Sequence, residues 1–398
     1  MGLFKQKLLW IGIVVVLLVL SIFGLAMMGS IVGAKPKELP VAIAVLDQPV
    51  KLPNGSTLAA GEMVKEKLLG NGQMPVRWIV ETSEAAVREG LDEQKYYGAL
   101  VLPADLSAGL LSLSSATPKP ATVQILVNEG MSTPASTAVS QMLQQVMAGV
   151  GTGFSQQLLS MAGGNSPTIP VVAATAMLTP IQTQVQLVHP IGANQASGNA
   201  PGLLTQIIWI GSLVTAAFLF LAGGQAAAQG AGRFGIAASQ LVSGVAVLAL
   251  VSGFIVWMAS GWYGVALADA AAVWLFLWLI GAAFFLLQSA LLIWIGLPAM
   301  ALLVLLMFFS MPVLNMPVEF LPQATQDWLY SWSPLRIAAS GLRNVLYYGG
   351  AQPLASNGAI LGWIAAGCGV VLLGSGLRPN AGASGTAAGK ESGGLQTQ

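Results

Sequence analysis

The sequence predicts an α-helical membrane protein with six transmembrane helices in a 1+5 layout and a water-facing α/β domain inserted after the first helix. Two observations lead to this fold class. Residues 8–32 form one isolated apolar run without charge, and five further apolar runs follow residue 203. A helix of about 20 apolar residues crosses the ~30 Å hydrocarbon core of a bilayer. The mixed stretch between them, residues 35–200, is long enough to fold as a domain of its own.

Composition supports the membrane assignment. The chain is 55% hydrophobic and 8% charged, whereas about 25% of the residues in an average soluble domain are charged. Most of the 15 acidic residues and more than half of the 16 basic ones lie between positions 35 and 129. A net charge of +1 without a basic cluster argues against nucleic acid as a partner. Cys368 is the only cysteine, which excludes a disulfide within the chain.

We expect residues 1–34 to form an uncleaved signal anchor. Lys5 and Lys7 precede the apolar run, and Gly33-Ala34 at its end is typical of a cleavage site. The apolar region of a cleaved signal peptide has about 7–15 residues, roughly half the length of this run, so a cleaved signal peptide is the less favoured alternative. Lysines and arginines near the expected span ends give only a weak preference for a cytoplasmic N-terminus.

Strands and helices alternate in the inserted domain. Residues 41–46 form a compact apolar strand that ends at Asp47, and residues 76–80, 98–102 and 122–127 predict three more strands. Helices are expected at residues 57–69 and from Thr82 or Ser83 to Gln94. This alternation predicts at least partly parallel pairing around a hydrophobic core.

A long amphipathic helix is expected after Pro134, because apolar residues recur there at spacings of three and four up to residue 159. It either packs on its own domain or serves as a stalk or subunit-pairing helix, and the residues alone leave both readings open. Residues 163–201 are rich in Gly, Pro, Gln, Thr and Ala, which predicts an extended return to the membrane.

The remaining spans are expected near residues 203–224, 236–260, 270–294, 298–316 and 357–377. No acidic residue or histidine falls inside them, whereas proton-driven carriers normally place such groups within the membrane. Gly358, Gly362 and Ala366 recur every four residues and form a small-residue face suited to close helix packing; packing within the chain is the plainer reading of this face. The tail at 379–398 has low complexity and is expected to be a disordered cytoplasmic segment.

The most specific pattern lies at residues 317–348, between the fifth and sixth spans. Its first half holds Pro317, Glu319, Pro322 and Asp327. Ser333-Pro334 then predicts a helix start, with a capping serine and proline at the first helical position.

The helix that follows places Arg336 and Arg343, seven residues apart, on one face, and Leu335, Ala338, Leu342 and Leu346 on the opposite face. We therefore expect a re-entrant pair of short amphipathic helices at the membrane surface or dipping into it. A plain interfacial loop is the alternative.

The sequence holds no recognisable catalytic, metal or cofactor site. His189 is the only histidine and stands beside Pro190, away from cysteines and acidic clusters. No serine lies in a nucleophile motif, and no phosphate-binding loop is present. An enzyme is therefore not expected.

Residues 317–343 resemble the re-entrant segment of type-2 ABC exporter permeases, in which a proline- and glutamate-containing run precedes short helices and an arginine. More closely, the chain resembles the phage infection protein (YhgE/Pip) branch of that superfamily. Residues 39–47 are similar to the opening strand of that family, residues 96–107 to its next signature, and Asn128-Glu129 to the pair that follows.

This resemblance implies an extracellular domain at 35–200, cytoplasmic termini and a homodimer in a bacterial plasma membrane. It also implies a separate cytoplasmic ATPase subunit, so that ATP acts only through a partner and coupling passes through the connection 225–235, which includes Gln225 and Arg233. The function expected from it is the membrane subunit of an ATP-driven exporter of hydrophobic or amphiphilic molecules. The alternative is a cell-surface interaction protein, such as a phage-adsorption receptor or a secretion-system accessory, anchored by its membrane bundle.

Overall fold

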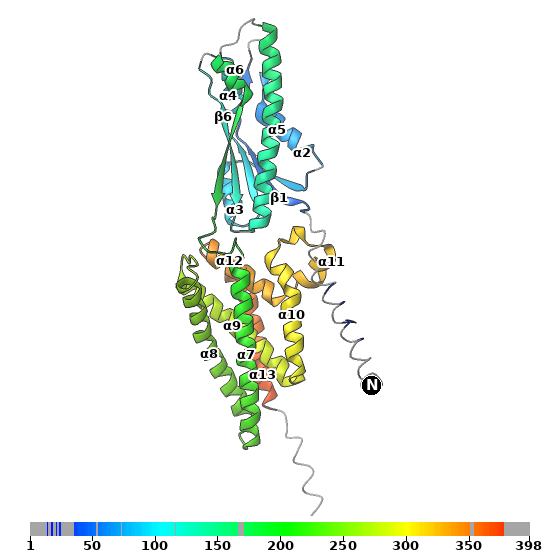
Figure 1. The fold of residues 1–398 in the computed structure, drawn as a ribbon, viewed down its shortest axis with the longest axis vertical. Helices are drawn as coiled ribbons and strands as arrows, with labels where there is room; N and C mark the ends of the chain where they lie inside the picture. The colour runs from blue at the N-terminus through cyan, green and yellow to red at the C-terminus, as the bar shows by residue number, and fades with distance from the viewer. Residues whose placement is uncertain are drawn as a thin grey trace, which may run out of the picture.

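The structure is a computed structural model that describes residues 36–377, apart from 53–54, 73, 116, 166–170 and 351–353, together with a few isolated positions before residue 36. An α/β domain stands on one end of a bundle of long helices (Figure 1). The expected tail at 379–398 lies outside the described residues, and so does the expected signal anchor at 1–34 apart from those isolated positions.

A five-stranded sheet in the order β4-β1-β5-β6-β7 forms the centre of the domain. β1 pairs in parallel with β4 and β5, β6 runs antiparallel to β5, and β7 is parallel to β6. The expectation of partly parallel pairing is therefore confirmed. The strands are β1 (Leu39–Val45), β4 (Val76–Glu81), β5 (Gly98–Leu102), β6 (Ala121–Asn128) and β7 (Ile181–Val188), and a separate hairpin joins β2 (Val50–Lys51) to β3 (Thr57–Leu58).

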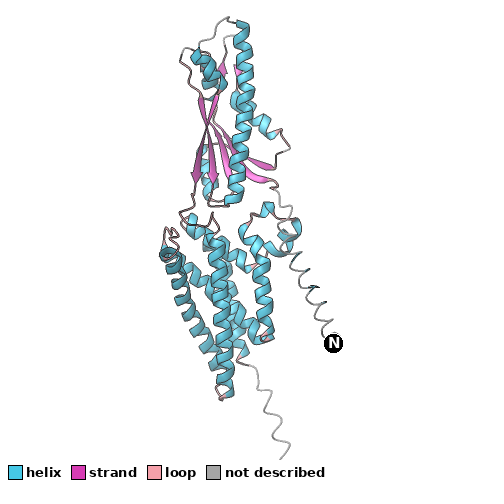
Figure 2. Ribbon diagram, in the orientation of Figure 1, coloured by secondary structure: helices cyan, strands magenta, loops and turns pink. Residues whose placement is uncertain are grey.

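Helices cover both faces of this sheet (Figure 2). On one face α2 (Ala60–Leu69), α4 (Leu106–Ser112) and α5 (Thr133–Asn165) share a core with alternate residues of β1, β5 and β6. On the other face α3 (Glu84–Asp92) buries Val87 and Leu91 against Ala42 and Ala44. The Ser83 hydroxyl accepts a hydrogen bond from the Ala86 N–H and caps α3, so of the two starts that the sequence left open, Thr82 and Ser83, the structure has Ser83.

The long helix α5 packs on its own domain. Val139, Leu143, Met147 and Val150 are buried in the core shared with the sheet. Of the two readings of its amphipathic pattern, the described part of α5 supports packing within the domain.

Two expectations for the domain are wrong in detail. Residues 163–201 are not only an extended return, because they also contain α6 (Val171–Leu178) and the fifth strand, β7. β7 is an edge strand with most of its residues exposed, so glutamines alternate with its apolar residues and no apolar run marks it. Likewise, the helix expected from residue 57 begins at Ala60, because Thr57 and Leu58 pair with β2.

Below the domain, the helices follow the expected spans closely. They are α7 (Ala200–Ala228), α8 (Arg233–Gly261), α9 (Ala270–Ile295), α10 (Pro298–Asn315) and α13 (Ala359–Ser375). Four helical stretches among the described residues are long and apolar enough to cross a membrane: Ala200–Ala228, Arg233–Gly261, Ala270–Ile295 and Ser356–Ser375. The 29 residues of α7 span about 44 Å at ~1.5 Å per residue. α10 is apolar but shorter.

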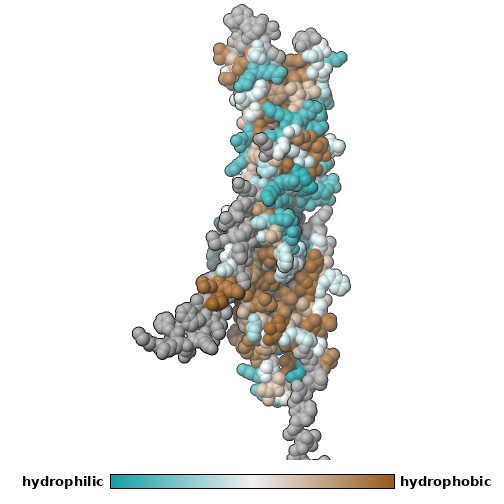
Figure 3. Space-filling view, turned by 90° about the vertical axis from the view of Figure 1, so that its right-hand side faces the viewer, coloured by the Kyte–Doolittle hydropathy of each residue, from teal (hydrophilic) through white to brown (hydrophobic). Residues whose placement is uncertain are grey.

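Apolar side chains gather over the bundle, and polar ones predominate over the domain (Figure 3). Together with the four spans this shows a membrane-embedded, multi-pass protein. α9 lies at the centre of the bundle, where Leu277, Ile280, Phe284 and Phe285 are completely buried. The Trp209 ring of α7 packs edge-on against the Phe284 ring, with centroids 4.7 Å apart.

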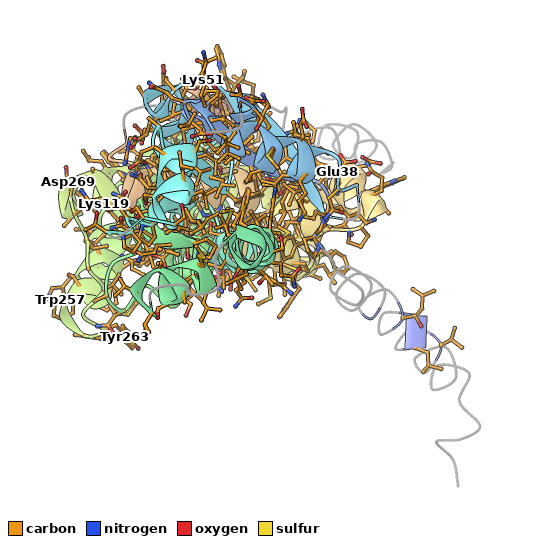
Figure 4. The ribbon with its side chains drawn as sticks, turned by 90° about the horizontal axis from the view of Figure 1, so that it is seen from above. Glu38, Lys51, Lys119, Trp257, Tyr263 and Asp269 are labelled. Atoms are coloured by element: carbon orange, nitrogen blue, oxygen red, sulfur yellow. The ribbon has the colours of Figure 1, made fainter. Side chains whose placement is uncertain are left out.

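The two ends of the bundle differ. At the domain end, the Ala266 N–H of the α8–α9 connection donates to the Ala193 carbonyl, just after β7. Trp257 and Tyr263 are exposed near this end of α8 and lie at the rim of the molecule seen from above (Figure 4). An aromatic belt of this kind is typical of a membrane–water interface. At the far end, Gly376 lies close to the backbone of Phe234, so the end of α13 packs beside the start of α8.

Candidate functional site at the junction of domain and bundle

The segment between α10 and α13 is folded and mostly packed. A 3₁₀ turn, η2 (Val318–Phe320), leads into α11 (Gln323–Thr325), a π-helical turn, η3 (Gln326–Tyr330), and α12 (Pro334–Tyr347). α12 packs on α7, α9 and α10 at the end of the bundle that faces the domain (Figure 1). Its apolar face is buried: Leu335, Ala338 and Leu342 are fully covered. The plain interfacial loop is therefore excluded, although the first of the two expected helices is a chain of short turns.

Ser333 stands at the N-cap position of α12, but its side chain makes no capping hydrogen bond. Its hydroxyl instead lies 2.9 Å from the Ser310 hydroxyl of α10, and both residues are completely buried. The expectation that this side chain caps α12 is wrong, because a buried hydroxyl on the neighbouring helix competes for it. The bond fastens the start of α12 to the bundle.

Glu319 connects this segment to the first half of the chain. The Tyr97 hydroxyl, at the start of β5, donates to the Glu319 carboxylate at 2.7 Å, and the Lys37 N–H donates to the Glu319 carbonyl at 3.2 Å. Burial raises the pKa of Tyr97, and the negative charge of Glu319 raises it further. Tyr97 therefore keeps its proton and remains a donor at physiological pH.

A second group of contacts joins the ends of β6 and β7 to the end of α12. The Tyr348 hydroxyl donates to the amide oxygen of Asn128 at 2.6 Å, and the Asn128 amide nitrogen donates to the Leu91 carbonyl at 2.8 Å. The His189 ring lies 4.2 Å from the Tyr348 ring, with Nε2 2.8 Å from an Asp92 carboxylate oxygen. Its Nδ1 lies 3.2 Å from the Tyr347 carbonyl. These contacts connect the C-terminal end of α12 to the ends of β6 and β7.

A cavity of about 110 Å³ lies at this junction. Gln94, Tyr97 and Ser132 line it from the domain, and Pro317, Tyr330, Arg336, Ser340 and Arg343 line it from the segment after α10, with the end of α10 completing the wall. The Arg336 guanidinium carbon lies 4.5 Å from the centre of the Tyr330 ring. The Arg336 Nε is buried without a hydrogen-bond partner among the described residues, and an Arg343 Nη reaches the Leu314 carbonyl only at 3.5 Å. The cavity is therefore lined by two cationic side chains, and one of their N–H donors, the Arg336 Nε, has no partner among the described residues.

Of the residues predicted for the re-entrant segment, Pro317, Arg336 and Arg343 come together at this cavity, with Glu319 beside it. Pro334 begins α12, as expected. Pro322 and Asp327 do not line the cavity: the Pro322 carbonyl accepts from the Thr325 N–H, and Asp327 is exposed and accepts from Gln323 at 3.0 Å.

The expected coupling connection at the far end is shorter than predicted. Gln225 belongs to the last turns of α7, so only residues 229–232 separate α7 from α8. Arg233 begins α8 and lines a groove of about 320 Å³ with Phe220, Ile236 and Gln240. Thus Arg233 lies at a surface depression, whereas Gln225 is an exposed helical residue.

The small-residue face of α13 is only partly covered by this chain. Gly358 is buried, Gly362 has open space where a Cβ would stand, and Ala366 is exposed. α13 instead packs on the bundle through Leu361, Gly369 and Leu372. Among the described residues, nothing covers the lower part of the face, so its role in helix packing stays a prediction.

Several junction residues were not singled out as site residues from the sequence, namely Tyr97, Asn128, His189, Tyr347 and Tyr348. One signal could have drawn attention to them: buried Tyr and Asn side chains need hydrogen-bond partners, and Tyr96-Tyr97 and Tyr347-Tyr348 stand at the ends of otherwise apolar elements. Their side-chain partners are far away in the sequence, from 97 positions for His189–Asp92 to 222 positions for Tyr97–Glu319, so no local pattern identifies them.

Fold and junction define a class: a multi-pass membrane protein whose α/β domain is hydrogen-bonded to a packed helical segment between its last two apolar helices. The chain belongs to the family described as "Protein of unknown function (DUF3533)", whose sequence model matches residues 9–368. Searches of curated proteins and of solved structures found no match to the chain.

Proposed function

We propose that this chain is the membrane subunit of an exporter of hydrophobic or amphiphilic molecules, working as a homodimer with a separate ATPase in a bacterial plasma membrane. In this proposal the chain crosses the membrane six times in the 1+5 layout, with the α/β domain outside and both ends inside. The resemblance to the phage infection protein branch of the type-2 exporter permeases motivates it.

One observation carries the proposal: the segment of residues 317–348 is bonded to both the external domain and the helices. Glu319 accepts hydrogen bonds from Tyr97 and Lys37, while Ser333 bonds to Ser310 within the bundle. A domain held only by an anchor needs no packed helix between its last two spans. A transporter, in contrast, needs an element that transmits movement between helices and domain.

The opposite end of the same helices offers a place for the ATPase. α7 and α8 each have 29 residues and run from the junction to the groove at Arg233. A movement imposed on that groove can thus reach α12 through α7, against which α12 packs. We expect the uncovered Gly362 and Ala366 face of α13 to contact the second copy of the homodimer.

The test is affinity purification of the full chain from gently solubilised membranes, with identification of any co-purifying ATPase. We expect an ATPase in the wild-type sample and a reduced amount with Arg233→Glu. The Lys119→Glu variant, which changes a charge on the domain, is the matched control and should leave the amount unchanged. The exporter proposal fails if no ATPase co-purifies with the wild-type chain and if Arg233→Glu leaves unchanged the resistance of the cells to hydrophobic or amphiphilic compounds.

A second candidate is a cell-surface interaction protein, such as a phage-adsorption receptor or a secretion-system accessory. One observation favours it: the connection at residues 229–232 is short, so an ATPase has little chain to hold there. This candidate predicts that domain-directed antibodies block adsorption of a phage or assembly of a secretion complex, whereas Arg233→Glu changes neither.

A further inference from the structure

We propose that the junction cavity binds a phosphate group held by Arg336 and Arg343, carried by the headgroup of a membrane amphiphile or present as free phosphate. The inference goes beyond the proposed transport function and does not depend on it, because a lipid bound for structural reasons would occupy the same place.

The charge of the residues lining the cavity favours a bound anion. The residues lining the cavity include two arginines and no acidic residue. Among the described residues neither arginine forms an ion pair, and the nearby Glu319 carboxylate accepts its hydrogen bond from Tyr97. A partly buried guanidinium loses much of its hydration and is stabilised by a bound anion. A hydrogen bond from a neutral tyrosine does not neutralise Glu319, so the two arginines and this one carboxylate leave a single net positive charge at the cavity, which an oxyanion would neutralise.

The placement of the two arginines on α12 suits a phosphate group. The arginines stand seven residues apart, two turns along the same face of α12, so both side chains enter the cavity from one wall. The Arg336 Nε is buried and has no partner among the described residues, and three hydroxyl-bearing residues, Ser132, Tyr330 and Ser340, also line the space. Guanidinium groups bind phosphate oxygens through paired N–H donors, and hydroxyls complete such sites.

Size distinguishes a headgroup from a whole substrate. The cavity of about 110 Å³ is several times the ~30 Å³ of one water but smaller than the ~300–1,000 Å³ pockets of drug-sized ligands. It therefore accommodates a compact polar group of a few heavy atoms, whereas the apolar part of an amphiphile would have to remain outside.

The position of the cavity along the molecule is consistent with the level of lipid headgroups in a bilayer. The cavity is lined by residues of both the domain and the segment after α10, and the surface changes from mainly apolar over the bundle to more polar over the domain (Figure 3). Trp328 and Trp332 lie two positions before and two positions after Tyr330, which lines the cavity. Their side chains are 81% and 55% exposed. Exposed tryptophans of this kind lie at the headgroup level of a bilayer, which brings lipid phosphates to the height of Arg336 and Arg343.

The experiment is native mass spectrometry of the full chain in detergent, with three additives: phosphatidylglycerol, a diacylglycerol with the same acyl chains, and inorganic phosphate. We expect the wild-type chain to retain phosphatidylglycerol or phosphate and not diacylglycerol. Arg336→Gln and Arg343→Gln should each weaken this binding about tenfold or more, because each removes charge-assisted hydrogen bonds. Arg233→Gln, which removes an arginine from the other end of the bundle, should bind as the wild type does.

Two variants keep the test decisive if loss of an arginine unfolds the chain. Arg343→Lys retains the charge but lacks the planar fork, and should bind with intermediate affinity. Ser340→Leu fills the cavity from α12 while both arginines remain, and should abolish binding. Retention of phosphatidylglycerol identifies a lipid headgroup, and retention of inorganic phosphate alone identifies a free anion. If the wild type retains neither, or if the arginine and Ser340 variants bind like the wild type, the proposal is overturned.

Discussion

The contact between Tyr97 and Glu319 gives the sharpest prediction, because one hydroxyl connects the sheet to the segment before α12. Tyr97→Phe removes this donor and leaves the ring in place. Tyr97 is only 4% exposed, and its hydroxyl lies 2.7 Å from the carboxylate. A hydrogen bond to a charged group contributes about 1.5–3 kcal/mol. Since Glu319 is only half-buried and water can replace part of the bond, we expect a loss of about 1–2 kcal/mol, a roughly 5- to 30-fold rise in local opening.

Hydrogen exchange measured by mass spectrometry reports this opening segment by segment. With Tyr97→Phe, exchange should accelerate in peptides covering residues 36–46 and 317–330, because the Lys37 N–H is bonded to the Glu319 carbonyl. Peptides from α9 should keep the wild-type rate. Tyr96→Phe is the matched control: its hydroxyl donates to the Ala86 and Val87 carbonyls inside the domain, so its effect should remain there.

A double-mutant cycle separates the bond from general damage. If Tyr97 and Glu319 interact as the structure shows, the combined Tyr97→Phe and Glu319→Ala variant should be clearly less perturbed than the sum of the single variants. Additivity within about 0.3–0.5 kcal/mol, the level of independent sites, would refute the reasoning. Tyr96→Phe combined with Glu319→Ala should be additive.

Four further predictions concern the rest of the chain. Gly98→Ala should destabilise the domain by about 1–3 kcal/mol in denaturant unfolding, because a Cβ would stand 2.8 Å from the Leu126 carbonyl oxygen, whereas Gly149→Ala meets only open space and should be neutral or slightly stabilising. Asn128→Ala should remove about 1–3 kcal/mol by leaving the Tyr348 hydroxyl and the Leu91 carbonyl unpaired; unchanged exchange at the end of α12 would contradict this. In a chain without Cys368, a cysteine replacing Trp328 should react with an impermeant thiol reagent on intact cells and one replacing Gln229 only after permeabilisation, and the reverse result would invert the proposed topology. Ala366→Cys should form a disulfide between copies on oxidation, whereas Val247→Cys, exposed on α8, should not; equal yields would argue against the α13 face as the dimer contact.

Local patterns were sufficient for the elements that bury a continuous apolar stripe or run. β1, β5 and the helices α7 to α10 begin and end within a few residues of the expected positions, because their apolar residues are dense and no charged residue falls inside the expected stretches. α12 was predictable for the same reason: Leu335, Ala338 and Leu342 recur on one face and are buried as a stripe. The edge strand β7 was missed because an exposed strand needs no apolar run.

The candidate site was predictable only in part. Placing Arg336 and Arg343 on one face of a helix follows from their spacing, but their cavity requires the end of α10 and the start of β5 as walls. The capping role expected for Ser333 failed for a similar reason, since Ser310 on another helix lies within hydrogen-bonding distance. Side-chain partners of this kind depend on which helices pack together, and spacing along the chain does not determine that.

By itself, the sequence determined where the apolar helices after residue 200 form, that a mixed α/β domain precedes them, and that two arginines share one helix face, because each of these follows from residue periodicity within one element. Only the tertiary structure decided that Tyr97 meets Glu319, 222 positions away, and that Asn128 meets Tyr348, 220 positions away. The physical reason is that such contacts form when separately stable elements dock, and docking depends on the whole buried surface and not on any local stretch. The positively charged cavity at the junction is a product of that docking.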